Sequence, residues 1–392
     1  MAVEPIISVR DLIMQMRICH MTTVHPAKDA RIFYRMSRAL AERGYVVTLI
    51  APESSADTDP LVRMSTWNAR LRQSGRSKRF ALALRAALAE RADIYHFHDP
   101  ELIPLGFVLK VLRPSAAVVY DVHEDYPAMM RVKYWIPKPL RPLIAQAAHF
   151  ANTAAGVCLD GIVVADPNVQ QDFQRVALHK SIVYYNFPTL SLFTPAPAKP
   201  SVAQADLVYI GGMSDRSGIF VLLDALALLA KQSITPSVRL AGYTDGEAGL
   251  VAIQQGIRIR GLSAHVELCG RIPHTQVPAW IRSGRIGLVT LQPIAKFLKN
   301  IPTKMFEYWA CGLPVIASDL PPIRPFLTNG KNGLLFAPTS AEDLARVIAW
   351  LMRHPSEGKV MGQHGQEQVS KDWNNDKQIN SLIGLYEQIC HR

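Results

Sequence analysis

A segment near residue 300 contains residue types that can bind a nucleotide. In KNIPTKMFEYWACGLPVIASD (299–319), Pro302 followed by TKMFEYWA predicts a short helix that ends at Gly312. The backbone N–H groups from Ile301 to Lys304 would be free at the start of this helix and would attract a diphosphate. Glu307, one to two turns further on, can accept hydrogen bonds from two ribose hydroxyls. The competing interpretation is an ordinary helix, turn and strand with an exposed glutamate.

A second group of reactive side chains follows apolar stretches in the first half of the chain. They are His96, His98 and Asp99 in one segment, and His123, Glu124 and Asp125 in another. On a strand, His96 and His98 point to the same face. These are residue types that ligate metals, so a metal site is one interpretation, although HxHD spacing alone is not specific for one. The sequence contains no GxSxG, HExxH, Walker A or CxxC motif.

The elements that must position these residues alternate between apolar strands and amphipathic helices. We expect strands at 17–22, 46–52, 94–98, 117–123, 161–165 and 182–186, and then at 207–211, 238–242, 266–270, 286–291 and 314–318. Most are apolar throughout, as strands buried on both faces are. Residues 30–43 and 372–389 have the apolar spacing of helices. The alternation predicts an α/β fold class with two Rossmann-like, doubly wound parallel-sheet domains.

A proline-rich stretch divides the chain, and 392 residues are too many for one core. Residues 186–206 hold four prolines and little periodicity. We therefore expect a flexible extension (1–15), an N-terminal domain (16–188), a linker (189–205), a C-terminal domain (206–371) and a C-terminal helix (372–392) that can cross back to the N-terminal domain. Ligands of doubly wound sheets bind at the carboxyl ends of the strands, so both domains are expected to face one interdomain cleft.

The segment EYWACGLPVIASD resembles the signature of retaining glycosyltransferase family 4, whose members have the GT-B fold of two facing Rossmann-like domains. Further stretches resemble family segments in the same order: HPAKDARIF (25–33), YHFHDPELIPLG (95–106), VVYDVHEDYP (118–127), YIGGMSDRSGIFVLLDAL (209–226) and CGRIPH (269–274). The resemblance extends from Met16 to Arg392. It implies that a sugar passes from a nucleotide diphosphate sugar to an acceptor hydroxyl with retained configuration and without a bound metal or other cofactor.

The resemblance also assigns donor-binding residues. Glu307 corresponds to the second glutamate of the family's pair, which holds the ribose. Gly211 and Gly212 belong to the phosphate-binding segment, and Gly270 and Arg271 to the loop that cradles the base.

This chain departs from the family pattern at two places. The first glutamate of the pair falls at Lys299, so Thr303 and Lys304 are the candidates for the sugar contact. The phosphate segment lacks the usual Arg and Lys, and Arg216 is the expected substitute cation, because a guanidinium can bind a diphosphate with two hydrogen bonds. The alternative for Arg216 is a surface position in a turn.

On the other domain, the resemblance places His123 beside the anomeric carbon and phosphate of the donor. There it can hold the sugar or donate a hydrogen bond to the leaving diphosphate, as a catalytic residue. The alternative is a histidine that is satisfied at the end of a strand. His98, Asp99 and Glu101 are candidates for acceptor hydroxyls or for capping the helix after Pro100, and Asp125 is a further acceptor-side candidate.

The net charge is 43 − 32 = +11, and the excess is concentrated between Arg63 and Arg91. A second stretch, MMRVKYWIPKPLRPLI (129–144), mixes basic with large apolar residues and contains no acid. Such stretches fit peripheral contact with an anionic membrane or a lipid phosphate, with a solvated basic face as the alternative. Nucleic acid is not an expected partner, because no nucleic-acid motif accompanies the charge.

No apolar run reaches the ~18 residues of a membrane span, and the first residues lack a secretory-signal pattern. The five cysteines, an odd number, are expected to be buried, reduced thiols. We expect a cytoplasmic hexosyltransferase-type enzyme, peripheral at the inner face of the plasma membrane. It would act on a lipid-linked saccharide acceptor for a bacterial exopolysaccharide, capsule or lipopolysaccharide. The alternatives are a nucleotide-sugar epimerase or hydrolase on the same fold, and a non-catalytic partner subunit that binds nucleotide sugars.

Overall fold

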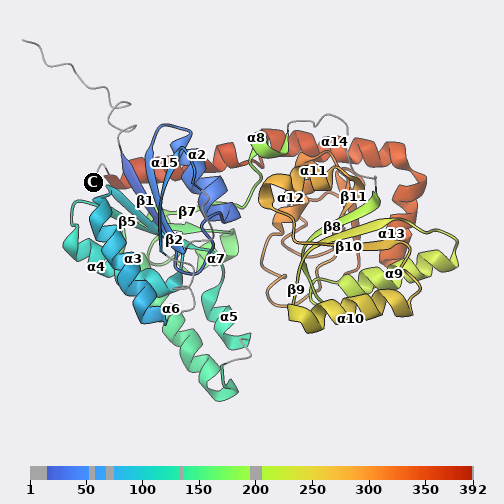
Figure 1. Ribbon diagram of the computed structural model, residues 1–392, viewed down its shortest axis with the longest axis horizontal. Helices are drawn as coiled ribbons and strands as arrows, with labels where there is room; N and C mark the ends of the chain where they lie inside the picture. Colours follow the sequence, from blue (N-terminus) through green and yellow to red (C-terminus); the bar gives the residue numbers. More distant parts are fainter. Residues whose placement is uncertain (1–15, 53–57, 68–74, 133–135, 195–204, 391–392) are drawn as a thin grey trace, which may run out of the picture. The chain divides into compact units, whose positions relative to one another are not determined.

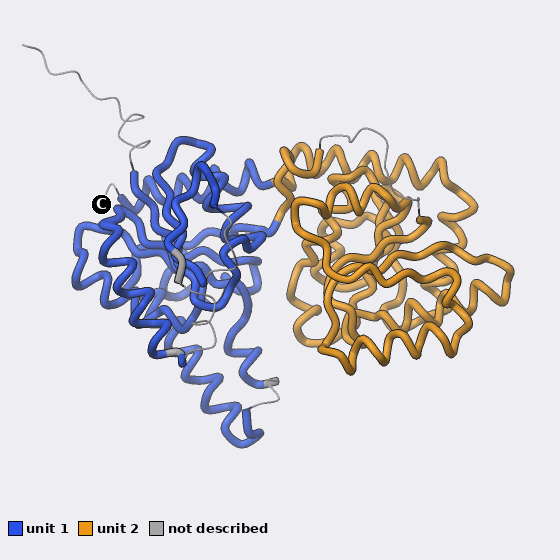
Figure 2. The backbone as a smooth tube through the Cα atoms, in the orientation of Figure 1, with its two compact units in different colours: residues 1–186, 375–392 blue, residues 187–374 orange. Residues whose placement is uncertain are grey.

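The protein consists of two compact units (Figure 2). The computed structural model describes residues 16–52, 58–67, 75–132, 136–194 and 205–390. Unit 1 runs to Asn186 and resumes at Asn375, and unit 2 comprises residues 187–374. The boundaries expected from the sequence were Pro188 and Lys371. The expected extension 1–15 and residues 195–204 of the expected linker lie outside the described residues, as do Arg70, Arg72 and Lys133 of the basic stretches.

Unit 1 is built on a parallel sheet with the strand order β3-β2-β1-β4-β5-β6-β7. The strands are β1 (Arg17–Met21), β2 (Val46–Pro52), β3 (Val62–Trp67), β4 (Ile94–Phe97), β5 (Ala117–Val122), β6 (Gly161–Val164) and β7 (Ser181–Val183). The strand order reverses between β1 and β4, where doubly wound sheets bind ligands. Strand β3 was not predicted, because VRMSTW alternates polar and apolar residues, as an edge strand can.

Helices cover both faces of this sheet (Figure 1). They are η1 (Ala30–Ser37), α2 (Arg38–Ala41), α3 (Arg76–Glu90), η3 (Pro100–Leu102), α4 (Ile103–Leu112), α5 (Tyr126–Val132), η4 (Lys138–Leu140), α6 (Arg141–Cys158), α7 (Pro167–Gln171), η5 (Leu178–Lys180) and α15 (Asn375–Cys390). One core contains Tyr95 and Phe97 of β4 with residues of α3, α4, α6 and α7. The opposite core contains Ile94 of β4 with residues of η1, α2 and α15.

Two helices of unit 1 differ from the prediction in detail. The helix expected at 30–43 begins as a π-helix, η1, and continues as α2. Asp29 caps η1, because its carboxylate accepts hydrogen bonds from the backbone N–H groups of Arg31 (2.8 Å) and Ile32 (3.0 Å). The helix expected at 372–389 is α15, which begins at Asn375 and packs against β6, β7, η1 and α2 (Figure 1).

Unit 2 has a six-stranded parallel sheet with the order β10-β9-β8-β11-β12-β13. The strands are β8 (Ala205–Met213), β9 (Val238–Thr244), β10 (Val266–Gly270), β11 (Gly284–Val289), β12 (Val315–Ser318) and β13 (Gly333–Phe336). The helices are α8 (Leu190–Phe193), α9 (Ile219–Lys231), α10 (Gly246–Ile259), η6 (His274–Gln276), α11 (Val277–Ile281), α12 (Thr303–Ala310), α13 (Ala341–Arg353) and α14 (Pro355–Lys371). Strand β13 was not predicted, because GLLF is too short to stand out.

Two further observations concern the expected cellular setting. No helix in the described part of the chain is both long and apolar enough to cross a bilayer. The expectation of five buried thiols was wrong for Cys158 and Cys390, which are exposed, whereas Cys19 is buried.

Candidate functional site

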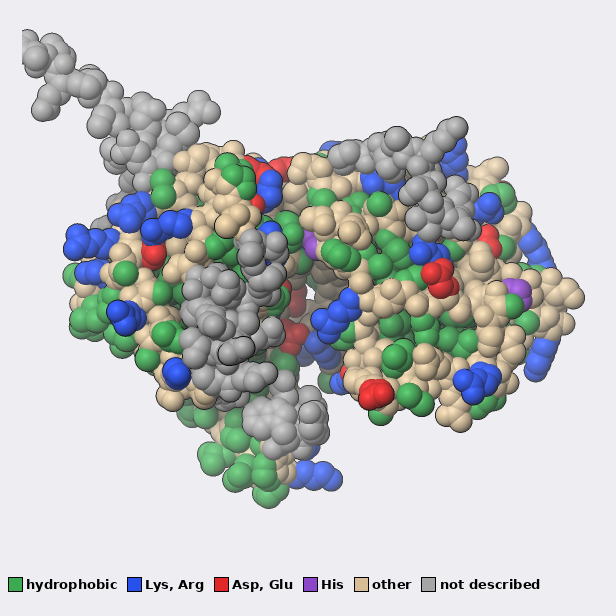
Figure 3. All heavy atoms as spheres, in the orientation of Figure 1, with side chains coloured by type: hydrophobic (Ala, Val, Ile, Leu, Met, Phe, Trp, Pro, Cys, Tyr) green, Lys and Arg blue, Asp and Glu red, His purple; other side chains and the backbone are tan. Residues whose placement is uncertain are grey.

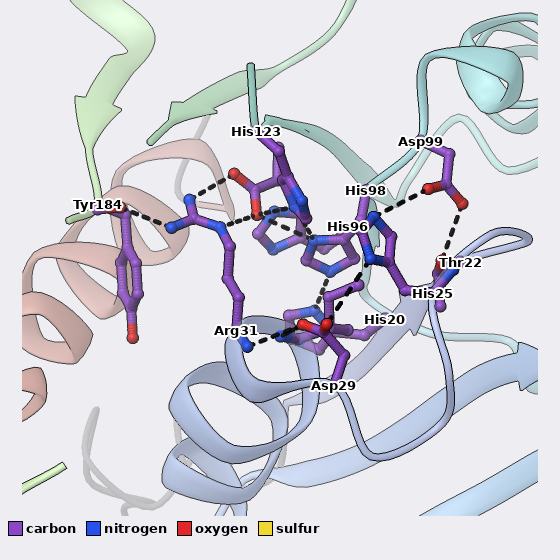
Figure 4. A network of polar contacts seen from close by, with 12 residues as sticks. His20, Thr22, His25, Asp29, Arg31, His96, His98, Asp99, His123 and Tyr184 are labelled. Atoms are coloured by element: carbon purple, nitrogen blue, oxygen red, sulfur yellow. Dashed lines mark hydrogen bonds and ion pairs between the residues drawn. The ribbon is translucent and has the colours of Figure 1, made fainter. Parts of the chain in front are cut away.

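The carboxyl ends of β1, β4 and β5 bring histidine and carboxylate side chains together in unit 1 (Figure 4). His20 of β1 pairs in register with His96 of β4, and both strands end one residue later. His98 and His123 are the first residues after β4 and β5. Because side chains alternate along a strand, His96, His98 and His123 lie on the sheet face that η1 and α15 cover.

Asp121 is the centre of this group. Its Oδ2 atom accepts hydrogen bonds from His98 Nδ1 (2.9 Å) and His123 Nε2 (3.0 Å). Arg31 of η1 adds two more, from Nε to Oδ2 (2.8 Å) and from Nη2 to Oδ1 (2.6 Å). Burial alone would raise the pKa of Asp121, but the charge of Arg31 and then that of His123 outweigh it and hold the pKa well below its usual range. Asp121 is therefore a buried carboxylate that fixes the ring of His123, whose side chain is 13% exposed.

A relay of hydrogen bonds continues from Asp121 into the sheet. A carboxylate only accepts, so His98 Nδ1 is the donor, and the Nε2 of a neutral ring is then an acceptor. His20 Nδ1 lies 3.0 Å from that Nε2 and donates to it. Burial lowers the pKa of both His98 and His20 and so favours the neutral rings that this relay requires. Both nitrogens of His98 thus have partners within the protein.

The same histidines form the candidate metal groups among the described residues. These are His20, His96 and His98, and His98, Asp121 and His123, with ligand atoms within 4.8 Å of one another in each group. Both groups need a nitrogen of His98, and its two nitrogens are engaged with Asp121 and His20. A metal would have to displace one of these hydrogen bonds, so the geometry favours a hydrogen-bonded relay.

Helix α15 packs against the histidines on this face of the sheet. The hydroxyl of Tyr386 lies 2.6 Å from His96 Nδ1, and both side chains are buried. Burial lowers the pKa of His96. The Nε2 atoms of His20 and His96 are buried and have no hydrogen-bond partner among the described residues.

The loop after β1 is hydrogen-bonded to Asp99, which lies where the strand order of the sheet reverses. The Oδ2 atom of Asp99 accepts hydrogen bonds from Thr22 Oγ1 (2.9 Å) and from the backbone N–H of Thr23 (2.5 Å). Glu101 accepts one from Thr23 Oγ1 (2.6 Å). His25 in this loop lies 3.6 Å from Asp99 Oδ1. Burial lowers the pKa of His25, but the hydrogen bond to Asp29 and the charges of nearby carboxylates raise it overall.

Asp125, the remaining acceptor-side candidate, lies at the start of α5. Its Oδ1 atom accepts a hydrogen bond from the backbone N–H of Ala128 (2.8 Å). Asp125 therefore caps this helix, and Asp99 holds a loop.

In unit 2, glycines let two strand ends approach each other closely. Gly211 of β8 pairs in register with Gly242 of β9, and both have positive φ, +132° and +139°. A Cβ on Gly242 would lie 1.8 Å from the carbonyl oxygen of Gly211. A Cβ on Gly211 would lie 3.1 Å from the Nζ atom of Lys304, and one on Gly212 would lie 3.1 Å from the ring of Tyr243. These glycines thus let backbone and side chains pack closely, and this edge, with the ammonium group of Lys304 beside Gly211, is a cationic cradle.

Helix α12 carries Lys304 to this edge, and Glu307 lies three residues further along the same helix. The ammonium group of Lys304 lies 3.7 Å from the centre of the Tyr209 ring, a cation–π contact. Tyr308 fixes the helix, because its buried hydroxyl accepts from the N–H of Ile210 (2.9 Å) and donates to the carbonyl of Leu288 (3.3 Å), which bridges β8 and β11. Glu307 is 9% exposed. The helix begins at Thr303, with Ile301 two residues before it, and Gly312 follows its end with a φ of +79°, as predicted.

The loop after β8 is fastened to the end of β11. Thr290 Oγ1 donates to the carbonyl of Ser217 (2.7 Å), and the N–H of Gln292 donates to the carbonyl of Arg216 (3.0 Å). The guanidinium of Arg216 is exposed and forms an ion pair with Asp245 (2.9 Å). Its expected role as a phosphate cation would require it to leave this partner.

The last residue of β10 and the residue after it complete the edge. Gly270 has a φ of +67°, and the guanidinium of Arg271 lies 5.4 Å from the centre of the Tyr243 ring. The phenol of Tyr243 is therefore close to both Gly212 and Arg271, which the sequence assigned separately to the phosphate and the base.

Sequence reasoning missed the residues that organise unit 1. Arg31 and Asp121 were not predicted, although both lie within segments that matched the family pattern. Tyr184, whose carbonyl accepts a hydrogen bond from Arg31 Nη1 (2.7 Å), and Tyr386 were also missed. For Asp121 the available signal was a charged residue inside an otherwise apolar strand, which needs a buried partner.

Two family models match adjoining parts of the chain. The model described as Glycosyltransferase Family 4 matches residues 30–187, and that described as Glycosyl transferases group 1 matches residues 204–354. Among curated relatives, the putative colanic acid biosynthesis glycosyltransferase WcaL of Escherichia coli K12 is 22% identical over 202 residues, 51% of this chain and 49% of the relative. The amylovoran biosynthesis glycosyltransferase AmsK of Erwinia amylovora is 23% identical over 186 residues, 47% of this chain and 45% of the relative. The chain thus spans about half the length of these relatives.

Solved structures match almost the entire chain. Sucrose-phosphate synthase from Thermosynechococcus elongatus has a TM-score of 0.74 at 19% identity, covering 96% of this chain and 99% of that one. Anabaena HepE in complex with UDP and glucose has a TM-score of 0.73 at 14% identity, covering 95% and 100%. At such identities the likeness concerns the fold, which is GT-B. Given both family models, the chain belongs to the family 4, group 1 glycosyltransferases.

Proposed function

We propose that the protein is a retaining, hexosyltransferase-type enzyme that moves a sugar from a nucleotide diphosphate sugar to a hydroxyl of a lipid-linked saccharide. The observation that carries the donor half of this proposal is the cradle of unit 2. Gly211 and Gly242 let the two strand ends pack closely, and the positive charge of Lys304 lies beside Gly211. A fixed positive charge beside strand ends and a helix start is an arrangement that suits a diphosphate.

The ribose is assigned to Glu307, and the diphosphate to Lys304 and the start of α12. In the transition state, positive charge develops at the anomeric carbon and negative charge on the departing phosphate. Lys304 and the free N–H groups at the helix start would stabilise the phosphate. His123, whose ring is fixed by Asp121, is proposed to hold the sugar or donate to the leaving group. Retention and independence of a metal ion follow from the family resemblance and are part of the proposal.

The acceptor and the cellular setting are proposed from the relatives and from the charge. WcaL and AmsK are named for the biosynthesis of two bacterial surface polysaccharides. The net charge of +11 fits an enzyme that is cytoplasmic and peripheral at the inner face of the plasma membrane, where a lipid-linked acceptor is presented. In the basic stretch 63–91, Arg63 pairs with Glu90 and Arg79 donates to the carbonyl of Thr23. The cations of this stretch are therefore not all available to lipid.

Calorimetry with UDP and a panel of nucleotide sugars tests the donor half. Glu307→Ala should lose charge-assisted hydrogen bonds to the ribose, about 1.5–3 kcal/mol or roughly 10- to 150-fold in affinity. Glu357→Ala, which removes an exposed glutamate at the start of α14, is the matched control and should bind as the native protein does. A Glu307→Ala variant with unchanged affinity would remove Glu307 from the site.

Product analysis then separates the transferase from its alternatives. Sugar transfer to a membrane extract with lipid-linked acceptors supports the proposal. Donor consumed equally well without any acceptor would indicate an epimerase or a hydrolase. Nucleotide binding without turnover would indicate a partner subunit. Retained activity in the presence of a strong chelator is expected for a reaction that needs no metal.

A further inference from the structure

Helix α6 of unit 1 carries apolar residues on a face that the unit does not bury. The exposed stripe consists of Leu143, Ala147, Phe150 and Val157, with the half-buried Ala154 between the last two. Spacings of four and three residues place these side chains along one side of a helix. Leu143 is 69% exposed, Phe150 64% and Val157 59%. Single exposed apolar residues are common on protein surfaces, but an aligned series of them marks an interaction site.

The opposite side of α6 already has its partners. Ala145, Asn152 and Ala155 are buried, and the helix packs against α4 and α5. The exposed stripe is therefore an additional apolar face and not the helix's contribution to the core. In Figure 3, hydrophobic side chains gather over the part of unit 1 where α6 lies, with Lys or Arg side chains beside them.

The charged residues that α5, η4 and α6 themselves carry after Tyr126 have one sign. From Tyr126 to Leu159 the sequence contains no aspartate or glutamate. Arg131 at the end of α5 and Lys138 in η4 are exposed near the start of α6. Leu140, between Lys138 and α6, is 48% exposed and continues the apolar surface.

We propose that the exposed stripe docks unit 1 onto an anionic lipid bilayer. The apolar side chains would enter the boundary between headgroups and acyl chains, and Arg131 and Lys138 would meet the lipid phosphates. A second copy of the chain is the other possible occupant, since the same spacing occurs in coiled coils. In such a dimer the cations beside one stripe would face the cations beside the other, whereas lipid phosphates would neutralise them. This inference rests on the proposed function, in which the acceptor is lipid-linked.

Vesicle partitioning of the 392-residue chain tests the proposal. Phosphatidylcholine vesicles with and without phosphatidylglycerol are sedimented at low salt with native protein and variants. Leu143→Ser/Phe150→Ser should lower partitioning to anionic vesicles by roughly 100-fold, about tenfold for each side chain withdrawn from the interface. Arg131→Gln/Lys138→Gln should lower it by about fivefold per cation, and only on anionic vesicles.

The matched control is Val251→Ser/Ile259→Ser on α10 of unit 2, where both side chains are exposed. It should partition as the native protein does. Circular dichroism and thermal unfolding confirm that each variant is folded, as expected for surface positions. The proposal is overturned if the native protein does not bind anionic vesicles or if the stripe variant binds equally well. It is also overturned if light scattering shows that the native protein is a dimer which the stripe variant dissociates while vesicle binding is unchanged.

A nucleotide-binding assay without lipid distinguishes a failure of the docking surface from a failure of the proposed function. A stripe variant that binds UDP normally but not vesicles supports the docking surface. A native protein that binds UDP but no vesicles would overturn the docking surface and leave the donor site as proposed. Failure to bind any nucleotide, with vesicle binding intact, would count against the proposed function alone.

Discussion

Replacing Asp121 by asparagine tests whether this carboxylate organises unit 1. Asparagine has nearly the same shape but no charge. Arg31 would keep its bonds from Nη1 to the carbonyl of Tyr184 (2.7 Å) and to Asn186 Oδ1 (2.9 Å), but it would lose the carboxylate that neutralises it. A buried charge left without its partner costs about 3–5 kcal/mol. We expect Asp121→Asn to lower the free energy of unfolding of unit 1 by this amount.

The assay must report on unit 1 alone, because two units need not unfold together. Pulse proteolysis across a urea series, with the fragments identified by mass spectrometry, provides this. Glu42→Gln is the control, since its exposed ion pair with Arg38 is worth about 0.3–0.5 kcal/mol. Arg31→Met/Asp121→Asn removes both charges and should lose clearly less than the sum of the two single variants. Additive losses, or a loss below about 1 kcal/mol for Asp121→Asn, would refute the reasoning.

Three other perturbations have defined outcomes. Burial lowers the pKa of His20, His96 and His98. Their contribution to the stability of unit 1 is therefore present above the unfolded pKa of about 6.5 and is lost as the pH falls. Urea titrations should show that stability falls as the pH is lowered from about 7.5 to 5.5, partly offset by His25, whose pKa is raised; constant stability over this range would contradict the prediction. Tyr386→Phe should cost unit 1 about 1–3 kcal/mol in the same assay, because His96 loses a buried partner, and a neutral effect would argue against that bond. Gly242→Ala should disrupt unit 2 by steric overlap, whereas Gly246→Ala, with no atom within 4 Å of the added Cβ, should cost only about 1–2 kcal/mol of backbone strain; equal thermal shifts would exclude the overlap.

Much of the fold could be predicted because parallel strands buried on both faces are continuous apolar runs. The segments at 46–52 and 266–270 were predicted with the bounds of β2 and β10. The two missed strands, β3 and β13, lack this signal, since one alternates in polarity and the other has four residues. His98 and His123 could be picked out because each is the first residue after a buried strand.

The partners of these residues could not be predicted from the chain. Arg31 and Asp121 are 90 residues apart in sequence, and only the assembled sheet brings them together. Tyr386 reaches His96 across 290 residues. For Arg216, charge type and position suggested a phosphate contact, but the competing carboxylate of Asp245 comes from the end of a neighbouring strand. Pairings of this kind depend on tertiary geometry, which spacing along the chain does not encode.

Unit 1 is discontinuous, and this constrains how the polypeptide can fold during synthesis. Helix α15 follows all of unit 2 in the chain, yet it contributes Ile379, Leu382, Leu385 and Tyr386 to the core of unit 1. While residues 187–374 emerge from the ribosome, the part of this sheet face that α15 covers stays exposed, although η1 and α2 already cover the rest. A nascent chain with such an apolar face is a substrate for chaperones, whereas unit 2 is continuous and can complete its core first.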